Sequence, residues 1–316
     1  MAEQLARLTA HARAQIGRVI VGQTSVVYQL ILVLLIGGHA LIEGVPGLAK
    51  TLAVKTLARI GRLQFHRVQC TADLMPADVM GTSVFNISSG QFSLHRGPIF
   101  TDLLLVDEIN RTPPRTQAAL LEAMEERQVT IDGTSYLLSG FFTVFATQNP
   151  IEFEGTYPLP EAQLDRFLLK IRIAYPQAEQ ETQILENYQQ GFDPRALDQI
   201  GLEPLPAEWL AAARAEVAAV RVEPALFRYI TSLARRTRDW PALSLGASPR
   251  AAVALLFAAK ATAAMDGRDF IIPDDVKAVA PAVLRHRLLL KPEADLEGVT
   301  PDSVVAELLS AVEVPK

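Results

Sequence analysis

A glycine-rich turn at Gly44–Thr51, with the sequence GVPGLAKT, constrains the fold of this chain more than any other segment. It follows a short apolar run, Ala40–Glu43, and leads into a segment of helical character. Small residues between a strand and a helix let backbone N–H groups surround phosphate oxygens, and the helix N-terminus adds partial positive charge. The turn therefore predicts a P-loop, a phosphate-binding connection from a strand into a helix.

The P-loop positions have expected contacts with ATP. Lys50 is expected at the β- and γ-phosphates, and the Thr51 hydroxyl at Mg²⁺. The general pattern has glycine before the lysine, where this chain has Ala49. If the backbone there needs a positive φ, alanine adds about 1–2 kcal/mol of strain, which should not abolish ATP binding. The expected nucleotide contacts in this segment are Gly44, Val45, Pro46, Gly47, Leu48, Ala49, Lys50, Thr51 and Leu52.

Composition limits the class of protein. A chain of 316 residues with 49% hydrophobic and 21% charged residues is long enough for two globular domains. A net charge of −5 argues weakly against a protein that mainly binds nucleic acid. The single cysteine, Cys70, excludes an intramolecular disulfide and a cysteine-cluster metal site. It fits a reducing compartment, so a cytoplasmic location is expected.

No membrane segment is expected from the sequence. The N-terminus carries Glu3, Arg7 and His11 among apolar residues, which does not resemble a signal peptide. The most apolar run, Val26–Ile36, is too short to span a bilayer and ends at Gly37. We therefore interpret it as a buried helix.

In the first half of the chain, short apolar runs alternate with longer helical segments. Such alternation predicts a parallel sheet covered by helices, an α/β fold. The expected strands are Ala40–Ile42, Phe65–Gln69, Leu103–Val106, Phe142–Ala146 and Leu168–Ile173. Two hairpins interrupt this pattern, one pairing Val84–Ile87 with Gln91–Leu94 around Ser88-Ser89-Gly90, the other pairing Val129–Ile131 with Ser135–Leu137.

After Pro176 no further strand is expected, and alanine-rich helical runs take over. The expected helices are Ala207–Val220, Pro224–Arg238, Pro249–Ala264 and Pro273–Arg287. Three of them begin with proline, which suits a first helical turn, and Pro281 is expected to kink or split the last. We therefore expect an α/β core at residues 1–176, a linker at 177–206 and a helical domain at 207–316.

Polar residues follow two of the expected strands. Asp107 and Glu108 come directly after Leu103–Val106, at the strand ends where open α/β sheets bind ligands. Asp107 can hold Mg²⁺, partly through water, and Glu108 can orient or deprotonate an attacking water. Four apolar residues before two acids are common, but the P-loop about 55 residues earlier supports a functional interpretation. Asn149, after the strand Phe142–Ala146, could bind the γ-phosphate or the water.

Two arginines are candidates for the cation that γ-phosphate hydrolysis needs. Arg166 precedes the last expected strand, and Arg250 begins a helix of the second half. An arginine near the end of a strand or helix is more often a solvated cation. The two gain interest only beside the other motifs.

Eight short motifs occur together over nearly the whole chain. They are Ile20–Gln23, Gly38–Gly47, Gly97–Phe100, Asp107–Arg111, Gln117–Glu126, Ala146–Pro150, Leu159–Phe167 and Ser248–Arg250. In combination the chain resembles the AAA+ ATPases, and within them the MoxR family. The resemblance implies a P-loop NTPase core with a parallel sheet and a C-terminal α-helical lid.

The resemblance also implies roles for single residues. Val21 and Gly22 would contact the adenine side of the nucleotide, and Asn149 would be the sensor-1 residue. Arg166 would be an arginine finger reaching a neighbouring subunit, with Arg111 and Arg115 as rivals for that role. Arg250 would be the sensor-2 residue and would report the γ-phosphate to the lid.

The implied mechanism is that of a ring ATPase, usually a hexamer. ATP·Mg²⁺ would bind between the α/β domain and the lid, and hydrolysis would change the angle between them. The ring would remodel or mature a client protein, with metal insertion as one possibility, alongside a von Willebrand factor A domain partner. The two hairpins would face the central pore or a partner.

Two other classes of function stay open. One is a nucleic-acid motor, against which stand the acidic pI and a hairpin, Val84–Leu94, without lysine or arginine. The other is a regulatory scaffold that binds ATP and barely hydrolyses it. Against it stands the complete set Lys50, Asp107, Glu108, Asn149 and Arg166.

Overall fold

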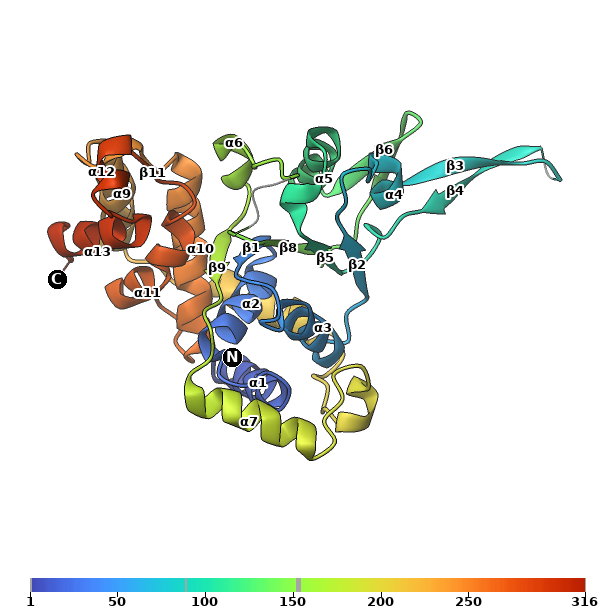
Figure 1. The fold of residues 1–316 in the computed structure, drawn as a ribbon. Helices are drawn as coiled ribbons and strands as arrows, with labels where there is room; N and C mark the ends of the chain where they lie inside the picture. The colour runs from blue at the N-terminus through green and yellow to red at the C-terminus, as the bar shows by residue number, and fades with distance from the viewer. Residues whose placement is uncertain (1, 89, 152–154, 316) are drawn as a thin grey trace.

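A five-stranded parallel sheet forms the centre of the protein (Figure 1). The computed structural model describes residues 2–88, 90–151 and 155–315. The strand order is β2 (Phe65–Gln69), β5 (Leu103–Asp107), β8 (Thr143–Gln148), β1 (Ala40–Glu43) and β9 (Leu169–Arg172). All five strands lie within two residues of the predicted ones, so the predicted α/β fold is confirmed.

Alternate residues of the strands enter two separate hydrophobic clusters, one on each face of the sheet. On one face, Ala40 and Ile42 pack with α1 (Ala2–Gly17), α2 (Thr24–Ile36) and α3 (Lys50–Ile60). On the other face, Leu41 packs with α4 (Pro76–Met80) and α5 (Pro114–Glu126). Because both faces of the sheet are covered, the inner strands β5 and β8 are buried almost throughout, whereas the edge strands β2 and β9 carry exposed polar residues.

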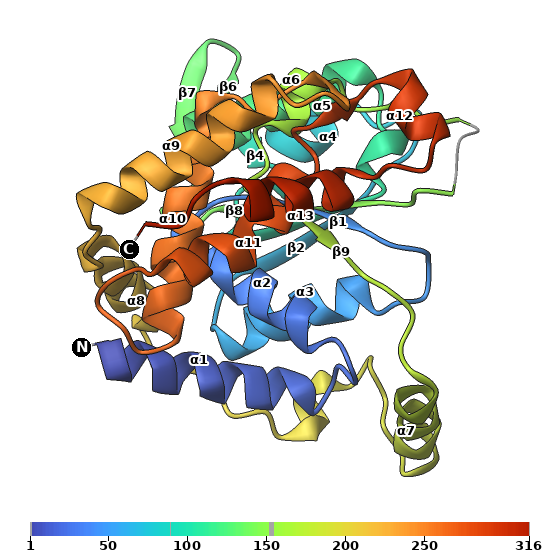
Figure 2. The same cartoon turned by 90° about the vertical axis from the view of Figure 1, so that its left-hand side faces the viewer.

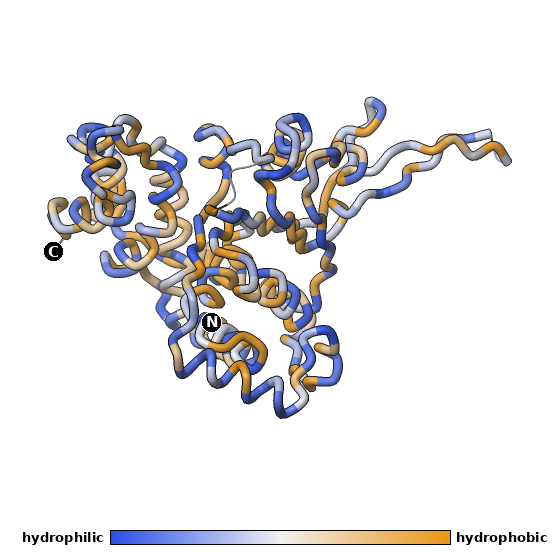
Figure 3. The backbone as a smooth tube through the Cα atoms, in the orientation of Figure 1, coloured by the Kyte–Doolittle hydropathy of each residue, from blue (hydrophilic) through white to orange (hydrophobic). Residues whose placement is uncertain are grey.

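The apolar run Val26–Ile36 lies within α2 and is largely buried, as predicted. Figure 3 shows the apolar residues concentrated in the sheet and in the helices packed on it. Among the residues that the structure describes, no helix is long and apolar enough to cross a membrane.

The second half of the chain is mainly helical and lies beside the β9 edge of the sheet (Figure 1). Its longer helices are α8 (Trp209–Ala219), α9 (Pro224–Arg238), α10 (Pro249–Met265), α11 (Pro273–Leu284) and α13 (Pro301–Ala311), with the short α12 (Pro292–Leu296) before the last. Helices α8 to α11 match the four predicted helices to within three residues at each end, and proline begins α9, α10 and α11 as expected. Helices α12 and α13 were not predicted. Pro281 was expected to kink or split its helix; a split is wrong, because α11 continues past Pro281 to Leu284.

A two-stranded sheet in this half, formed by β10 (Leu243–Leu245) and β11 (Leu289–Leu290), was not predicted from the sequence. These strands are too short to give a periodic signal. The helical half also shares one buried cluster with α1, α2 and the sheet, which includes Leu30, Ala258 and Val283. The two predicted domains therefore pack through a continuous core.

Both predicted hairpins are present. β3 (Gly81–Asn86) pairs with β4 (Gln91–Arg96), and β6 (Gln128–Ile131) pairs with β7 (Thr134–Leu137). Ser89, in the predicted turn of the first hairpin, lies outside the described residues. The β3–β4 hairpin extends far from the body of the molecule (Figure 1).

The predicted linker, residues 177–206, contains the helix α7 (Ala178–Gln189) and the 3-10 helix η2 (Leu197–Ile200). Helix α7 buries none of its residues, and Figure 2 shows it standing out from the body beyond α1. Most residues of this helix are polar, so its sequence did not predict a helix packed on the core.

Candidate nucleotide site and a second arginine cluster

The Gly44–Thr51 turn joins β1 to α3, as the P-loop pattern predicts. Ala49 has φ 56° and ψ 23°, so alanine occupies the left-handed conformation at the start of the helix. Gly47 also has a positive φ, 86°, and a Cβ built there would meet no atom within 4 Å. The Lys50 Nζ donates to the Gly44 carbonyl at 2.5 Å, which brings the ammonium over the loop.

The acidic pair at the end of β5 lies beside the P-loop. The Thr51 hydroxyl donates to Asp107 Oδ2 at 3.3 Å, which joins the two predicted metal-binding residues. The Thr147 hydroxyl donates to Asp107 Oδ1 at 2.5 Å and accepts from the Glu108 N–H at 2.9 Å. Glu108 itself has φ 60°, and a left-handed conformation at such a residue costs about 1–2 kcal/mol. Thr147 therefore holds both acids, one through its carboxylate and one through its backbone.

Each acid also has a cationic partner that the sequence analysis did not assign to it. Arg67 Nη2 lies 2.7 Å from Asp107 Oδ2, and Arg111 Nε lies 2.9 Å from Glu108 Oε2. Gln69 Nε2 donates to Glu108 Oε2 at 3.2 Å. The signal that could have found Arg67 and Gln69 is their place in β2, the neighbour of β5, at the middle and the carboxyl end of the strand. Arg111, a rival for the intersubunit role, is held within its own chain by this ion pair.

Asn149 follows β8 at the same edge of the sheet, where it is buried. Its Oδ1 accepts from the Ile151 N–H at 3.2 Å, which fixes the side chain. The structure therefore brings Lys50, Thr51, Asp107, Glu108 and Asn149 together at the carboxyl ends of β1, β5 and β8, where a parallel sheet binds ligands.

A cavity adjoins the P-loop. Val21 and the P-loop residues Gly47, Leu48 and Ala49 line one side, together with Leu52. Gly22 packs so closely on α7 that a Cβ there would lie 2.3 Å from Gln180 Oε1. The opposite wall comes from residues 176–192 and includes Ile184, Tyr188 and Phe192.

The sequence analysis missed this wall, because it treated residues 177–206 as a linker. The rings of Tyr188 and Phe192 are 5.5 Å apart in a T-shaped contact. The helices of the C-terminal half do not contribute to the described lining of this cavity. The nucleotide was expected between the core and those helices, and the cavity beside the P-loop is lined instead by α7 and the turn after it.

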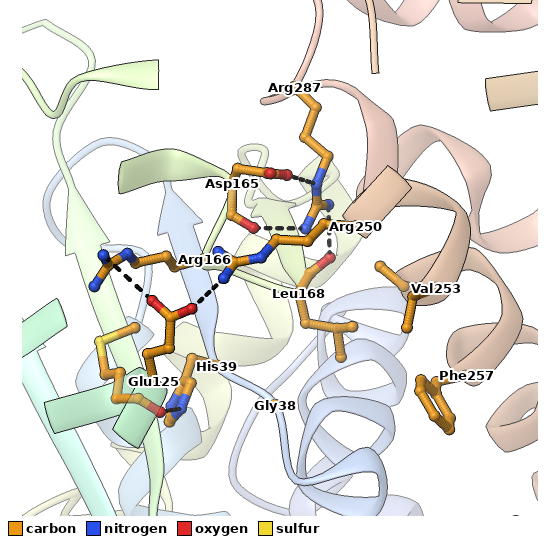
Figure 4. Close-up of a pocket in the computed structure, with 12 residues that line it drawn as sticks. Gly38, His39, Glu125, Asp165, Arg166, Leu168, Arg250, Val253, Phe257 and Arg287 are labelled. Atoms are coloured by element: carbon orange, nitrogen blue, oxygen red, sulfur yellow. Dashed lines mark hydrogen bonds and ion pairs between the residues drawn. The ribbon is translucent and has the colours of Figure 1, made fainter. Parts of the chain in front are cut away.

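The two candidate arginines lie elsewhere. Arg166 Nη2 is 3.2 Å from Glu125 Oε2, and Arg250 Nη2 forms a short ion pair with Glu125 Oε1 (Figure 4). These residues line a pocket with Gly38 and His39, which precede β1.

The arginine cluster and the P-loop lie at opposite ends of β1. Gly38 precedes the strand and Gly44 follows it, a separation of about 20 Å at about 3.3 Å per residue. The α5 helix starts after β5 and returns to the amino ends of the strands, where Arg127 Nη2 donates to the Gly37 carbonyl at 2.6 Å. Arg250 thus lies away from its own P-loop, contrary to the expected contact with the nucleotide of its own chain.

A buried network holds both arginines in place. Arg287, whose side chain is 3% exposed, donates to Asp165 Oδ1 at 2.7 Å and to the carbonyl oxygens of Phe167 and Leu168. Asp165 Oδ2 accepts from the Ser248 hydroxyl at 2.8 Å, and Ser248 caps α10. Asp165 therefore joins the segment before β9, which carries Arg166, to the helix that begins with Arg250.

His39 lies in the wall of the same pocket and is buried. Its Nδ1 accepts from the Val144 N–H at 2.9 Å, and its Nε2 contacts the Met124 carbonyl at 3.1 Å. Burial lowers the pKa of His39 to about 4. The imidazole is therefore neutral near pH 7 and structural in role. Burial also raises the pKa of the Cys70 thiol to about 11, which leaves it unreactive.

The donor atoms at the P-loop edge fit a magnesium ion. A threonine hydroxyl next to an aspartate carboxylate supplies the hard oxygen ligands that Mg²⁺ prefers when it is also bound by phosphate and water. Among the described residues, no group of three or more His, Cys, Asp or Glu side chains could hold a metal by itself.

The fold and its site match known proteins. A model of the ATPase family associated with various cellular activities (AAA) matches residues 39–169, and a model of the AAA lid domain matches residues 235–308. Chaperone MoxR1 of Mycobacterium tuberculosis is 42% identical, over 96% of this chain and 81% of that protein. This chain belongs to the MoxR family of AAA+ ATPases.

Other relatives are similar to this MoxR-family protein over nearly its whole length. The uncharacterized protein YeaC of Bacillus subtilis is 44% identical, over 99% of this chain and 97% of that protein. The crystal structure of a candidate ATPase from Cytophaga hutchinsonii has a TM-score of 0.91 and 39% identity, covering 100% of this chain and 97% of that one. The predicted AAA+ fold with a C-terminal helical lid is thus confirmed.

Proposed function

We propose that this MoxR-family ATPase binds ATP with Mg²⁺ at the P-loop edge of its sheet. Lys50 and the backbone of Gly44–Thr51 hold the phosphates, and the adenine lies in the cavity between Val21 and Tyr188. Thr51 and Asp107 hold Mg²⁺, which supplies charge neutralisation and alignment of the phosphates when bound. The fit of the donor atoms and the open space above Gly47 support this assignment.

Glu108 is the general base in this proposal. Its carboxylate follows the buried strand β5 next to Asp107, within reach of a water near the γ-phosphate. Asn149 helps to orient that water from the end of β8. Gln69 and Arg111 hold the Glu108 carboxylate through contacts of 3.2 and 2.9 Å, so they position the base.

Arg166 and Arg250 complete the site of a neighbouring subunit. The observation that carries this proposal is their joint position in the pocket at the amino end of β1, where Gly38 is separated from the P-loop residue Gly44 by about 20 Å of extended chain. A guanidinium there can reach a γ-phosphate only across a boundary between chains. The resulting assembly is a ring, with six subunits as the expected number. Arg115, exposed in the first turn of α5, is the weaker candidate for this role.

The ring acts as a cytoplasmic chaperone on a client protein or complex, with a von Willebrand factor A domain protein as partner and metal insertion as one form of maturation. The name of its relative, Chaperone MoxR1, supports this class of function. The β3–β4 hairpin supports it as well, because Ile87 and Phe92 are 90% and 73% exposed at its end. An apolar hairpin suits a protein client better than a phosphate backbone, so the helicase alternative is less favoured.

The test has two parts. Lys50→Ala and Glu108→Gln should each reduce ATP turnover by about a hundredfold or more, since each removes a group in contact with the reacting phosphate or water. Unchanged turnover in Glu108→Gln would contradict its role as the base and would favour the regulatory scaffold if Lys50→Ala were equally neutral.

The second part mixes inactive subunits. Arg166→Ala and Glu108→Gln chains should regain activity when combined, because an intact base and an intact arginine then meet at about a quarter of the boundaries. A mixture that stays inactive after exchange of subunits would show that the arginine acts within its own chain.

A further inference from the structure

The Glu125 carboxylate is the shared partner of the two arginines assigned above to the neighbouring site. One oxygen pairs with Arg166 and the other with Arg250 (Figure 4). The three residues come from different parts of the fold, namely the end of α5, the segment before β9 and the start of α10. A guanidinium stays charged at all relevant pH values. Two of them held side by side therefore need an anion between them.

The side chains of these three residues are more exposed to solvent than those of the neighbouring ion pair between Arg287 and Asp165. The side chains of Arg166, Glu125 and Arg250 are 31%, 34% and 51% exposed. Those of Arg287 and Asp165 are 3% and 21% exposed. A partly solvated ion pair contributes little and exchanges easily, whereas breaking a buried one is costly. The outer pairs can therefore be replaced while the inner pair keeps the backbone in place.

We propose that Glu125 is an internal competitor for the γ-phosphate of the neighbouring subunit. Its carboxylate neutralises Arg166 and Arg250 in the isolated chain and releases both when a nucleotide triphosphate approaches from the next chain. A γ-phosphate offers three acceptor oxygens and more charge than a carboxylate, so it is the stronger partner for two guanidinium groups. ADP lacks that group and leaves the arginines on Glu125.

Exchange of these ion pairs links assembly to the state of the nucleotide. Arg166 lies in the core segment before β9, and Arg250 begins the lid helix α10. Release of both arginines from Glu125 therefore frees one side chain of the core and one of the lid at the same time. Glu125 lies on α5 and remains with the core. The proposal rests on the proposed function, since it requires that the two arginines act on a neighbouring chain.

The experiment measures assembly against nucleotide concentration by sedimentation velocity. All chains carry Glu108→Gln to slow hydrolysis, with Glu125→Gln as the variant. Glutamine keeps the shape and the helix propensity of glutamate and removes the charge. Glu307→Gln, on the exposed side of α13, makes the same change of charge elsewhere. The two pairs resemble surface ion pairs, so we expect Glu125→Gln to lower the ATP concentration for half-maximal assembly by about three- to tenfold.

The comparison with ADP separates this role from a purely structural one. ADP-dependent assembly should be unchanged in Glu125→Gln, and Glu307→Gln should follow the parent with both nucleotides. An unchanged or higher ATP requirement in Glu125→Gln would overturn the proposal. So would an equal shift with ATP and ADP, because it would point to a general change in the interface.

Failure of the proposed function gives a different result. If Arg166→Ala and Arg250→Ala, each made without Glu108→Gln, retain the turnover and assembly of the unchanged protein, the neighbouring-site role itself is wrong. If both are impaired and Glu125→Gln has no effect, only the competition by Glu125 is wrong.

Discussion

Arg287 and Asp165 form an ion pair at 2.7 Å that joins the helical lid to the segment before β9. Burial lowers the pKa of the Arg287 guanidinium, although Asp165 opposes this shift. The cation keeps its charge because the carboxylate and several backbone carbonyls accept its hydrogen bonds. The pair thus fixes the positions of Arg166 and Arg250 without contacting the predicted nucleotide site.

Removing the carboxylate should strongly destabilise the fold. Asp165→Asn leaves a buried guanidinium without its counter-ion, and such a change costs about 3–5 kcal/mol. Urea unfolding followed by circular dichroism measures the loss. Asp269→Asn is a matched control, because Asp269 pairs with Arg221 where both side chains are about two-thirds exposed. That control should lose less than about 1 kcal/mol. Equal losses would mean that burial does not determine the strength of the inner pair.

Stability should fall in acid because of His39. Its pKa is lowered from 6.5 to about 4, so the unfolded chain binds more protons between these values. The stabilisation is complete above about pH 6.5 and is lost progressively as the pH falls to about 4, on the order of 3 kcal/mol in all. Protonation of Nδ1 would also remove the acceptor for the Val144 N–H.

The measurement is the urea midpoint at a series of pH values. His39→Gln should flatten the decline between pH 6.5 and 4, because a neutral side chain replaces the titrating one. Part of the slope should remain, since the pKa of buried His286 is lowered in the same direction. An unchanged slope in His39→Gln would show that His39 does not titrate in this range.

Replacing Ala49 by glycine should stabilise the chain. The left-handed backbone at φ 56° costs alanine about 1–2 kcal/mol, and the greater freedom of glycine in the unfolded chain offsets about 0.4–1 kcal/mol of that gain. A net gain of about 1 kcal/mol or less is expected, with ATP binding retained. Ala211→Gly, on the exposed face of α8, should instead destabilise by about 1 kcal/mol. A loss of stability in Ala49→Gly would contradict the strained conformation.

The aromatic side chains that line the P-loop cavity allow a test of where the adenine ring of the nucleotide binds. Tyr188→Ala should weaken ATP and ADP alike by about 5- to 150-fold, because stacking between a base and an aromatic ring contributes about 1–3 kcal/mol. Titration with a fluorescent adenine nucleotide measures both affinities. Leu185→Ala, an exposed position on the same helix, should leave them unchanged. An effect on ATP alone would place Tyr188 near the γ-phosphate instead.

The fold was predictable because its signals are local. The inner strands β1, β5 and β8 are short, mostly apolar runs, and three of the four predicted helices begin with proline, so no long-range contact was needed to find them. Helices α12 and α13 also begin with proline but were not predicted. The exceptions follow the same logic. α7 buries none of its residues, and β10 and β11 are too short to show a period.

The sequence by itself determined the chemistry at the carboxyl edge of the sheet. Lys50, Asp107 and Asn149 each follow a strand closely, and parallel strands end at one edge. Only the tertiary structure decided which edge the arginines occupy, because residues 125, 166 and 250 come together through the path of α5 and the packing of α10. Sequence spacing carries no information on such contacts. The same holds for Ala49, whose backbone angle is set by the turn into α3 and the packing around it.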